Sequence, residues 1–322
     1  MRVTFRIHRF NPELDRRSHW EEYRLPVWRG MTVLDGLIFL RNQQDGTLSF
    51  RYSCQSAICG SCAMEINGTD KLACRTPVRP ELERHGQVQV GPMPNFPVIK
   101  DLVMDMSAFW GKVQQVTPWL SSSEPEGKTS STQELPLPQG HGDFHNVDAC
   151  IMCGACVAAC TSLEVSSSFL GPAALAKADR FVSDPREPEE AKYQRLLELE
   201  KPDGIWDCTR CNYCVEVCPK DVKPMDAIIR LRRAAIERGL TASGGARHII
   251  GFSDLIHREG RLNEALMPLK VVGFHPRGLM KVLALGFRML LKGKVPNPLG
   301  HSLPGLANIR RIFRSFRSTL NS

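Results

Sequence analysis

The positions of twelve cysteines constrain what this chain of 322 residues can fold into more than any other sequence feature. They form three sets of four, and no cysteine is left over. The first set has the spacing C-x4-C-x2-C with a fourth cysteine downstream, and comprises Cys54, Cys59, Cys62 and Cys74. The second and third sets share the spacing C-x2-C-x2-C-x3-C, and comprise Cys150, Cys153, Cys156 and Cys160, and Cys208, Cys211, Cys214 and Cys218. Such clustering in a chain without an export signal indicates metal or redox chemistry.

These two kinds of spacing predict two kinds of iron–sulfur cluster. The first is that of a plant-type [2Fe–2S] loop, where small residues such as Gly60 let backbone N–H groups approach sulfur. The other two are typical of bacterial ferredoxins, in which the fourth cysteine of each run ligates the cluster of the other run. We therefore predict one [4Fe–4S] cluster on Cys150, Cys153, Cys156 and Cys218, and another on Cys160, Cys208, Cys211 and Cys214.

Zinc is the main alternative for these cysteines, because a single C-x2-C pair is often part of a zinc site. Two complete four-cysteine runs and a C-x4-C-x2-C loop are far more specific for iron–sulfur clusters. Disulfides are disfavoured, since cysteines two positions apart rarely bridge. The nine histidines show no ligand spacing, and neither a phosphate-binding glycine loop nor a nucleophile elbow is present. We therefore expect no catalytic residues and no substrate site in this chain.

The fold expected is α+β, with an N-terminal β-grasp ferredoxin domain at residues 1–105 that surrounds the first cysteine set. A helix is predicted at residues 32–44, where Thr32 and Asp35 have the spacing of a capping box. Alternation of apolar and polar residues and short apolar runs predict strands at residues 3–7, 23–27, 63–66 and 87–90.

A connecting helix and linker are expected at residues 106–144, since apolar residues between Val98 and Val113 recur at helical spacing and Ser, Pro, Gly and Glu dominate residues 121–142. An α-helical domain with the two [4Fe–4S] clusters is expected at residues 145–240. Its predicted segments are a helix that begins near Pro172, a solvated helix and loop at Asp184–Lys201, and a helix at Pro224–Arg238 capped by Gly239.

A basic extension is expected at residues 241–322. Gly244-Gly245 predicts a break, residues 252–266 a helix, and residues 279–291 an apolar segment too short and too charged to span a bilayer. Ten Lys and Arg and no Asp or Glu occur from residue 270 onward, whereas the other residues carry 32 basic against 34 acidic side chains. This balance argues against nucleic-acid binding by the folded body. The extension is expected to dock on a partner or a membrane surface, or to pack on the second domain.

Several runs beyond the cysteines are similar to those of a known family. They are Tyr52-Ser-Cys-Gln-Ser-Ala-Ile-Cys-Gly-Ser-Cys-Ala-Met, Leu72-Ala-Cys-Arg-Thr, Pro97-Val-Ile-Lys-Asp-Leu-Val-Met-Asp-Met, Phe169-Leu-Gly-Pro-Ala-Ala-Leu and Cys214-Val-Glu-Val-Cys-Pro-Lys. In order and separation they resemble the iron–sulfur subunit of the succinate dehydrogenase and fumarate reductase family. The resemblance covers about residues 1–240.

The resemblance implies an electron-transfer subunit of an oxidoreductase complex. A separate flavoprotein subunit holds FAD, and the [2Fe–2S] cluster is nearest to that flavin. The cluster on Cys150, Cys153, Cys156 and Cys218 is then the middle relay, and the last cluster faces a membrane anchor and, indirectly, quinone. A peripheral position on the cytoplasmic side of the cell membrane is expected, because the N-terminus shows no apolar signal core.

The chain departs from the commoner members of this family at its third cysteine set. Those members lack a cysteine at the position of Cys211 and carry a [3Fe–4S] cluster, so Cys211 predicts a second [4Fe–4S] cluster here, with [3Fe–4S] as the alternative. Thr161 replaces the usual Pro, and the usual quinone-site Trp and His are absent.

The extension resembles variant members whose anchor is a separate CCG-containing subunit. Two other interpretations remain open: an electron-transfer subunit of another flavin-linked oxidoreductase, of heterodisulfide-reductase-like or thiol:fumarate type, and a stand-alone ferredoxin.

Overall fold

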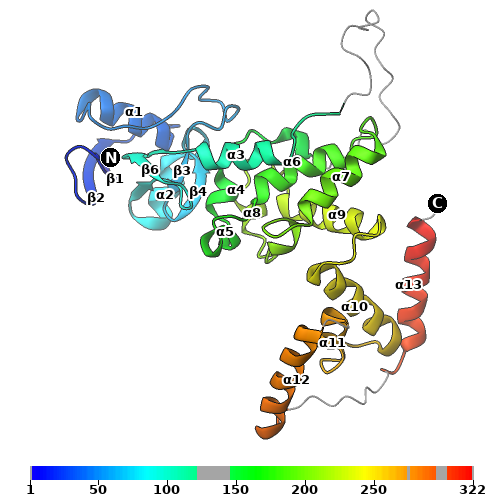
Figure 1. Cartoon of the computed structure of the whole chain (residues 1–322). Coiled ribbons are helices and arrows are strands. Elements are labelled where there is room, and N and C mark those ends of the chain that lie inside the picture. Colours follow the sequence, from blue (N-terminus) through cyan, green and yellow to red (C-terminus); the bar gives the residue numbers. More distant parts are fainter. Residues whose placement is uncertain (1, 122–145, 274–275, 295–302, 321–322) are drawn as a thin grey trace, which may run out of the picture. The chain divides into compact units, whose positions relative to one another are not determined.

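A computed structural model of the chain describes residues 2–121, 146–273, 276–294 and 303–320 (Figure 1). The chain divides into two compact units, Met1–Ala234 and Ala235–Ser322. All three cysteine sets belong to the first unit. Within the described ranges, no helix is both long enough and apolar enough to cross a membrane.

The N-terminal part of the first unit is a mixed five-stranded sheet with the order β2-β1-β5-β3-β4. Its strands are β1 (Arg2–Arg9), β2 (His19–Pro26), β3 (Ala63–Ile66), β4 (Thr69–Leu72) and β5 (Val88–Gly91). β1 and β5 run parallel, and the other neighbours are antiparallel. The accompanying helices are α1 (Val33–Gln43) and α2 (Val78–His85). The α+β class and all four predicted strand regions are confirmed.

Helix α1 packs on the sheet through an apolar face that includes the fully buried Leu37 and Leu40. Its predicted capping box is present: the Thr32 hydroxyl accepts from the Asp35 N–H at 3.2 Å, and the Asp35 carboxylate accepts from the Thr32 N–H at 2.9 Å. A Cβ on Gly36 would lie 2.5 Å from the ring of Phe5 on β1. The glycine therefore sets how closely this helix approaches the sheet.

A buried arginine joins this sheet to the segment that leads towards the second cysteine set. Arg9 on β1 donates to Asp101 at 3.1 Å and to Thr47 at 2.7 Å. Asp101 also accepts from the backbone N–H of Phe10 at 3.0 Å and of Ser49 at 2.9 Å. Because one carboxylate satisfies a buried guanidinium and two backbone donors, it fixes the turn in which it lies.

The helix expected from Val98 onward is wrong in its first half. The structure has a two-stranded ribbon of β6 (Val98–Lys100) and β7 (Val103–Met104), and the helix α3 begins only at Ser107 and ends at Gln115. Asp101, between the strands, has a left-handed φ of 47°, which a right-handed helix does not allow. The expected linker at residues 121–142 lies almost entirely outside the described residues.

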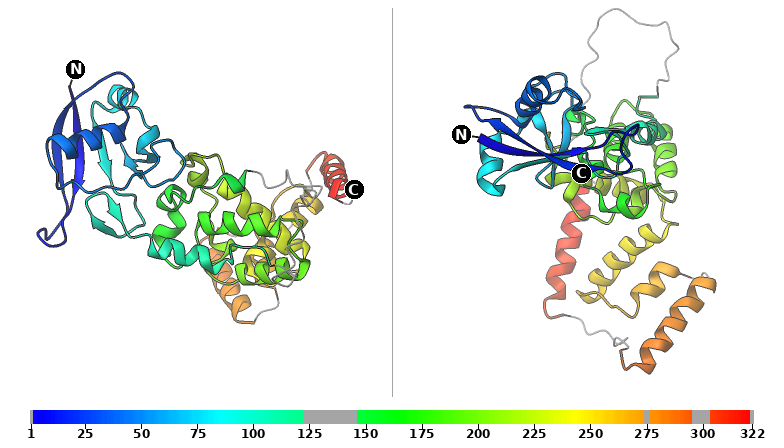
Figure 2. Two further views of the ribbon diagram at one scale, coloured as in Figure 1. Left: turned by 90° about the horizontal axis from the view of Figure 1, so that it is seen from above. Right: turned by 90° about the vertical axis from the view of Figure 1, so that its left-hand side faces the viewer.

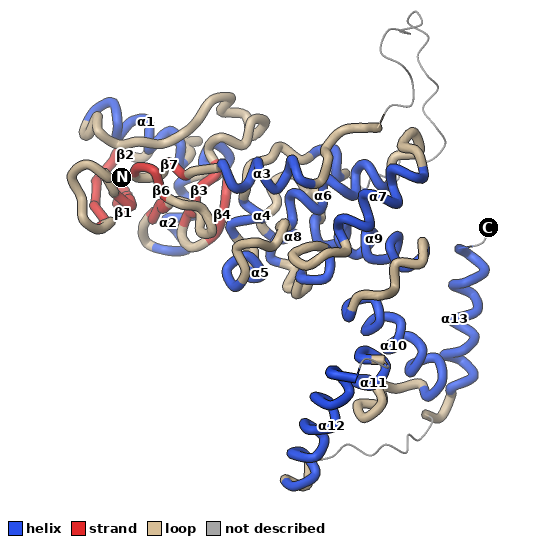
Figure 3. Tube along the Cα trace, viewed as in Figure 1, coloured by secondary structure: helices blue, strands red, loops and turns tan. Residues whose placement is uncertain are grey.

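The rest of the first unit is helical and surrounds α6, which packs against α3, α4 and α7 (Figure 3). Figure 2 shows the sheet beside these helices. The helices are α4 (Ala155–Ala158), α5 (Thr161–Val165), α6 (Pro172–Val182), α7 (Glu189–Leu199), α8 (Tyr213–Glu216) and α9 (Pro224–Glu237), with single 3₁₀ turns at Val147–Ala149 and Ile205–Asp207. A further 3₁₀ turn, Ala73–Arg75, follows β4 in the sheet part. The predicted helix starts at Pro172 and Pro224 are confirmed.

The stretch Asp184–Lys201 is not the solvated segment that its charge suggests. Asp184 and Glu187 are buried, and Arg195 pairs with Glu187 at 2.8 Å. Arg195 also donates to the backbone oxygens of Val116 at 2.5 Å and Trp119 at 3.3 Å. Arg195 on α7 therefore holds the segment that follows α3 in place. Its charge can be buried because it is paired and hydrogen-bonded.

The second unit contains α10 (Gly244–Glu259), α11 (Met267–Val272), α12 (Pro276–Leu291) and α13 (Leu306–Leu320). The helix predicted at residues 252–266 begins earlier and ends at Glu259. Gly244-Gly245 opens α10 rather than breaking the chain, because the Ser243 hydroxyl caps the helix by accepting from the Ala246 N–H at 3.2 Å.

Candidate iron–sulfur centres

The first cysteine set begins on the loop between α1 and β3. Three backbone N–H groups point at the Cys54 sulfur, from Ser56 at 3.4 Å and from Ile58 and Cys59 at 3.3 Å each. These hydrogen bonds lower the pKa of Cys54 to about 6. A loop wound in this way presents a thiolate, which is the form that binds iron.

The loop brings Cys54, Cys59 and Cys62 together, and Cys74 joins them from the 3₁₀ turn after β4. Gln55 and Ala57 have φ values of 54° and 55°, and this left-handed winding turns successive N–H groups towards Cys54. Cys62 is buried before β3, and burial together with the neighbouring thiols of Cys74 and Cys59 raises its pKa to about 12. Closely packed thiols in a partly dry site resist ionisation until a cationic core compensates their charge.

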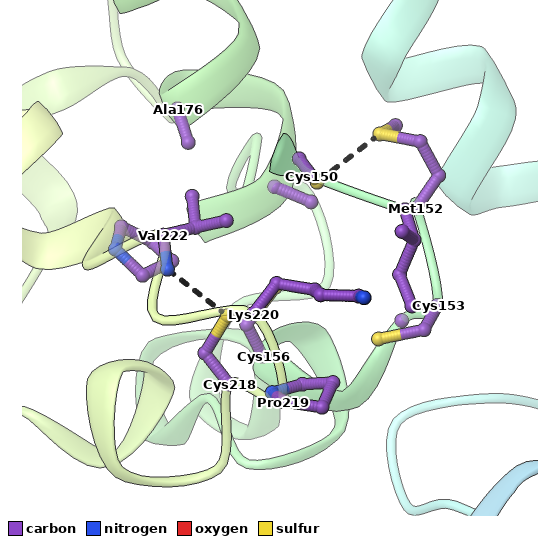
Figure 4. A pocket seen from close by; sticks show the side chains of 13 residues that line it. Cys150, Met152, Cys153, Cys156, Ala176, Cys218, Pro219, Lys220 and Val222 are labelled. Atoms are coloured by element: carbon purple, nitrogen blue, oxygen red, sulfur yellow. Dashed lines mark hydrogen bonds between the residues drawn. The ribbon is translucent and has the colours of Figure 1, made fainter. Parts of the chain in front are cut away.

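The second ligand set, which takes its first three cysteines from one run and the fourth from the other, surrounds a cavity (Figure 4). All four of its predicted sulfur ligands line this cavity, namely Cys150, Cys153, Cys156 and Cys218. The last of them comes from beyond α8, so two segments about sixty residues apart meet here. Cys160, the other end of the same run, is not part of this lining. The lining of this cavity thus groups three cysteines of one run with the fourth cysteine of the other run.

Apart from the sulfurs and Lys220, the side chains that line this cavity are apolar, and they include Ala173, Ala176 and Val222. Burial raises the pKa of Cys153 to about 11 and that of Cys156 well above its usual value, and the neighbouring cysteines add to both shifts. The Val222 N–H donates to the Cys218 sulfur at 3.4 Å. A dry pocket lined by four sulfurs fits a [4Fe–4S] cluster, whose potential depends on such hydrogen bonds and on solvent exclusion.

The third ligand set, Cys160 with Cys208, Cys211 and Cys214, also comes together. Cys208 and Cys211 lie on the loop before α8, and Cys214 lies in α8 itself. Burial raises the pKa of Cys214 to about 12, and the thiols of Cys208, Cys160 and Cys211 contribute in that order. Cys211 is the exposed member of the set. Although its partial burial opposes ionisation, hydrogen bonds led by that of the Thr161 hydroxyl, at 3.5 Å, lower the pKa of Cys211. These hydrogen bonds favour the thiolate of Cys211, which is the form in which a cysteine binds metal.

Two features beside the third set were not foreseen from the sequence. The hydroxyls of Thr161, the buried Ser162 and the exposed Thr209 form a small group, and the Thr209 N–H donates to the Ser162 hydroxyl at 3.2 Å. The buried Arg232 of α9 donates to the backbone oxygens of Ile205 at 2.7 Å and Cys208 at 2.9 Å. An arginine in an amphipathic helix gives no sequence signal that separates this role from a solvated one.

A further cavity lies between the first two sets, with Cys59 on one side and Cys153 on the other. Five methionines contribute to its walls: Met64, Met93, Met104, Met106 and Met152. Arg75, next to Cys74, donates to the backbone oxygen of Pro219, next to Cys218, at 3.1 Å. The two sets are thus neighbours across soft, polarisable side chains.

The four cysteines of the second ligand set surround a cavity. In residues 2–121, 146–273, 276–294 and 303–320, no three or more His, Cys, Asp or Glu side chains are grouped tightly enough for one metal ion. The cavity enclosed by Cys150, Cys153, Cys156 and Cys218 fits instead a core of several atoms, as in an iron–sulfur cluster.

Comparison with known families gives two matches that together cover most of the first unit. Residues 4–111 match the 2Fe-2S iron-sulfur cluster binding domain, and residues 146–222 match the 4Fe-4S dicluster domain. A chain of the Mycobacterium smegmatis Sdh1 complex in the apo form has the same fold, with a TM-score of 0.65 at 24% identity over 75% of this chain and 98% of that chain.

Curated relatives are similar over nearly their whole length. The fumarate reductase iron-sulfur subunit of Haemophilus influenzae is 37% identical over 70% of this chain and 90% of that protein. The subunit of the same name from Mycobacterium tuberculosis is 39% identical over 74% of this chain and 95% of that protein. The chain therefore belongs to the fumarate reductase iron–sulfur subunit family.

Proposed function

We propose that the three cysteine sets hold, in chain order, a [2Fe–2S] cluster and two [4Fe–4S] clusters that conduct electrons in series. As a family member, the chain is an electron-transferring subunit of an oxidoreductase complex. The observation that carries the ligand assignment is the cavity lined by Cys150, Cys153, Cys156 and Cys218. Such clusters take up and release single electrons, and the chain's own part is to hold them, exclude water and donate hydrogen bonds to sulfur.

The exposure of the cysteines supports an order along the relay. Cys59 in the first set and Cys211 in the third are exposed, whereas every cysteine of the middle set is at least partly buried. A relay needs its terminal clusters near partner surfaces and its middle cluster shielded. The first and third sets therefore serve as the two ends, and the set around Cys156 is the middle relay.

Partner surfaces lie beside both exposed cysteines. Ile58, next to Cys59, is 65% exposed, and Val165 and Tyr213, near the third set, are 90% and 50% exposed. Exposed apolar side chains at a functional site are typical of protein interfaces. We assign the first surface to an FAD-containing flavoprotein subunit and the second to a membrane anchor, through which quinone exchanges electrons.

The division of the chain follows from the same assignment. We propose residues 1–105 as the [2Fe–2S] domain, residues 106–144 as the connection, residues 145–240 as the domain of the two four-iron clusters, and residues 241–322 as a docking extension. The complex is membrane-bound and this subunit is peripheral. We place it on the cytoplasmic side, because twelve cysteines that serve as metal ligands suit a reducing compartment.

The test is activity of the purified complex with its clusters intact. Succinate-driven reduction of an artificial dye, or fumarate-driven oxidation of a reduced dye, is expected, and replacement of Cys156 by Ser should abolish transfer to the anchor while leaving flavin reduction intact. A complex replete in clusters that handles neither succinate nor fumarate would contradict the proposal.

A second candidate is an electron-transfer subunit for a thiol-linked flavoenzyme with a CCG-containing anchor. Two features favour it: the fourth cysteine at Cys211 and the helical extension of α10 to α13. Reduction of fumarate by a thiol, with no turnover of succinate with quinone, would support this alternative over the first.

A further inference from the structure

Helix α12 leaves its apolar side chains in solvent. None of its residues is buried, and six of its large apolar side chains are 58–72% exposed. They are Met280, Leu283, Leu285, Phe287, Leu290 and Leu291. The helix contacts α11 near its start, where a Cβ on Gly278 would lie 2.5 Å from Val272, and the exposed residues follow that contact.

The charged residues of α12, together with Lys292 directly after the helix, form one narrow stripe. Arg277, Lys281, Arg288 and Lys292 are separated by four, seven and four residues. At about 100° per residue, these spacings place all four within about 60° of the helix circumference. The apolar residues occupy most of the remaining circumference. The helix is thus apolar over a wide arc and purely basic over a narrow one.

Helix α13 provides an internal comparison, because it is also amphipathic and basic but has a partner within the same unit. Its Ile309 and Phe313 face α10: Ile309 is within 3.1 Å of the position of a Cβ on Gly260, and the Phe313 ring lies 5.2 Å from that of His257. Arg310 donates to the backbone oxygen of Arg258 at 3.2 Å. This unit therefore covers the apolar face of α13 at Ile309 and Phe313 with its own residues, whereas the apolar residues of α12 named above are left open.

The charge of the C-terminal residues indicates what kind of surface covers α12. From Lys270 to the end of the sequence there is no acidic residue, so the surface it meets has to be anionic or neutral. A nucleic acid would leave Leu283 and Phe287 in water, because its backbone offers charge and little apolar area. A bilayer with anionic lipids accepts both faces, since the apolar arc enters the acyl boundary and the lysines and arginines reach the headgroups.

We propose that α12 lies flat in the interface of an anionic membrane and binds acidic phospholipid headgroups. With sixteen residues the helix is about 24 Å long. Its apolar arc lies among the acyl chains, and the stripe of Arg277, Lys281, Arg288 and Lys292 contacts lipid phosphates. The inference is independent of the cluster assignment, and it gives this subunit its own contact with the membrane.

The experiment measures co-sedimentation of the purified full-length chain with vesicles. One set is phosphatidylcholine, and the other contains about one third phosphatidylglycerol. Binding to the anionic vesicles is expected, weakened by salt, and at least about tenfold weaker on neutral ones. Lys281→Glu with Arg288→Glu, and separately Leu283→Ser with Phe287→Ser, should each weaken binding at least about tenfold. Visible cluster absorption, measured on every variant, reports whether the first unit is intact.

The matched control is Arg79→Glu with Arg84→Glu on α2, which makes the same change of charge at exposed positions outside the extension. This variant should bind vesicles almost as well as the unmodified chain. Equal binding to both vesicle types, or none to either, would overturn the proposal. Vesicle binding that depends on the basic stripe but not on Leu283 and Phe287 would also overturn the proposal, because recognition by charge alone indicates a soluble polyanion. A dimer that the Leu283/Phe287 variant dissociates would assign the face to a second copy of the chain.

Discussion

A Cβ atom built on Gly60 would lie 2.8 Å from the Cβ of Cys153. It would also lie 3.0 Å from the Cα of Cys153 and from the backbone oxygen of Ile151. Gly60 belongs to the loop of the first cysteine set, and Cys153 is a proposed ligand of the middle cluster. The backbone of one site thus touches the backbone of the next, and only a residue without a side chain allows this contact.

Gly60→Ala should therefore separate the two sites. The atoms that the new Cβ would meet belong to the backbone and to the proposed ligand Cys153, so they can move only at a large energetic cost. We expect the free energy of unfolding to fall by about 2–4 kcal/mol. Magnetic coupling between the first two clusters in EPR spectra should weaken, and electron transfer between them should slow.

Gly68→Ala is the matched control for this variant. Gly68 has the same φ of 74° as Gly60, but nothing lies within 4 Å of its Cβ position. The Gly68→Ala variant should lose only about 1 kcal/mol of stability, which is what alanine costs in a left-handed conformation, and the first two clusters should stay normally coupled in EPR spectra. Equal effects of the two substitutions on coupling would contradict the role assigned to Gly60.

Cys211→Ser should convert the last cluster from [4Fe–4S] to [3Fe–4S], because the remaining sulfurs of the third set hold three corners of a cubane. An EPR signal of the three-iron form should appear in the oxidised state. Thr161→Val removes the hydrogen bonds of this hydroxyl with Cys211, at 3.5 Å, and with Thr209, at 3.4 Å, and it should keep four irons while shifting the potential. A spectrum that Cys211→Ser leaves unchanged would refute this ligand assignment.

Arg232→Leu should lower the reduction potential of the same cluster. The buried guanidinium faces Cys208, and a nearby positive charge stabilises the more negative, reduced cluster. At about 10 Å and an effective dielectric constant of about 20, one charge corresponds to tens of millivolts. Arg232→Lys keeps the charge and should keep most of the potential. A redox titration in which Leu and Lys variants shift equally would show that only the hydrogen bonds matter.

Asp70→Asn should change how stability depends on pH. Burial and the charge of Glu65 raise the pKa of Asp70 to about 7 from 3.8, and its Oδ1 has no hydrogen-bond partner within the described part of the chain. The folded state therefore binds more protons than the unfolded state between about pH 4 and 7. Stability is lost as the pH rises through this window, by an amount on the order of 3–4 kcal/mol.

In Asp70→Asn this loss should disappear, so the variant should gain stability over the unmodified chain at pH 8 and differ little at pH 4. Thermal unfolding at the two pH values checks this. A difference between the two proteins that does not change with pH would show that Asp70 is ionised in the folded state.

Local patterns predicted the parts of this fold that depend on neighbouring residues. Alternation located the strands, and Thr32 and Asp35 marked the start of α1 at the correct residue. Cysteine spacing also predicted which sulfurs meet, because ligand exchange between the two runs follows from the length of each run. The grouping of Cys150, Cys153 and Cys156 with the distant Cys218 is the clearest case.

The parts that sequence reasoning missed depend on long-range partners. Periodicity over residues 98–113 favoured one helix, but Asp101 is held in a turn by Arg9, far away in the chain. The charge of Asp184–Lys201 suggested solvent, but Arg195 is buried on Glu187 and on backbone oxygens. Patterns of neighbouring residues do not reveal these contacts, and in both segments the tertiary contacts outweigh the structure that the local pattern favours.

The most direct test of the account is the iron and acid-labile sulfide content of the anaerobically purified chain, measured together with zinc. Three clusters on twelve cysteines correspond to about ten irons and about ten sulfides per polypeptide. We expect those values and no stoichiometric zinc. Iron and sulfide far below that level in freshly isolated protein, or zinc in their place, would contradict the claim that these cysteines form an electron relay.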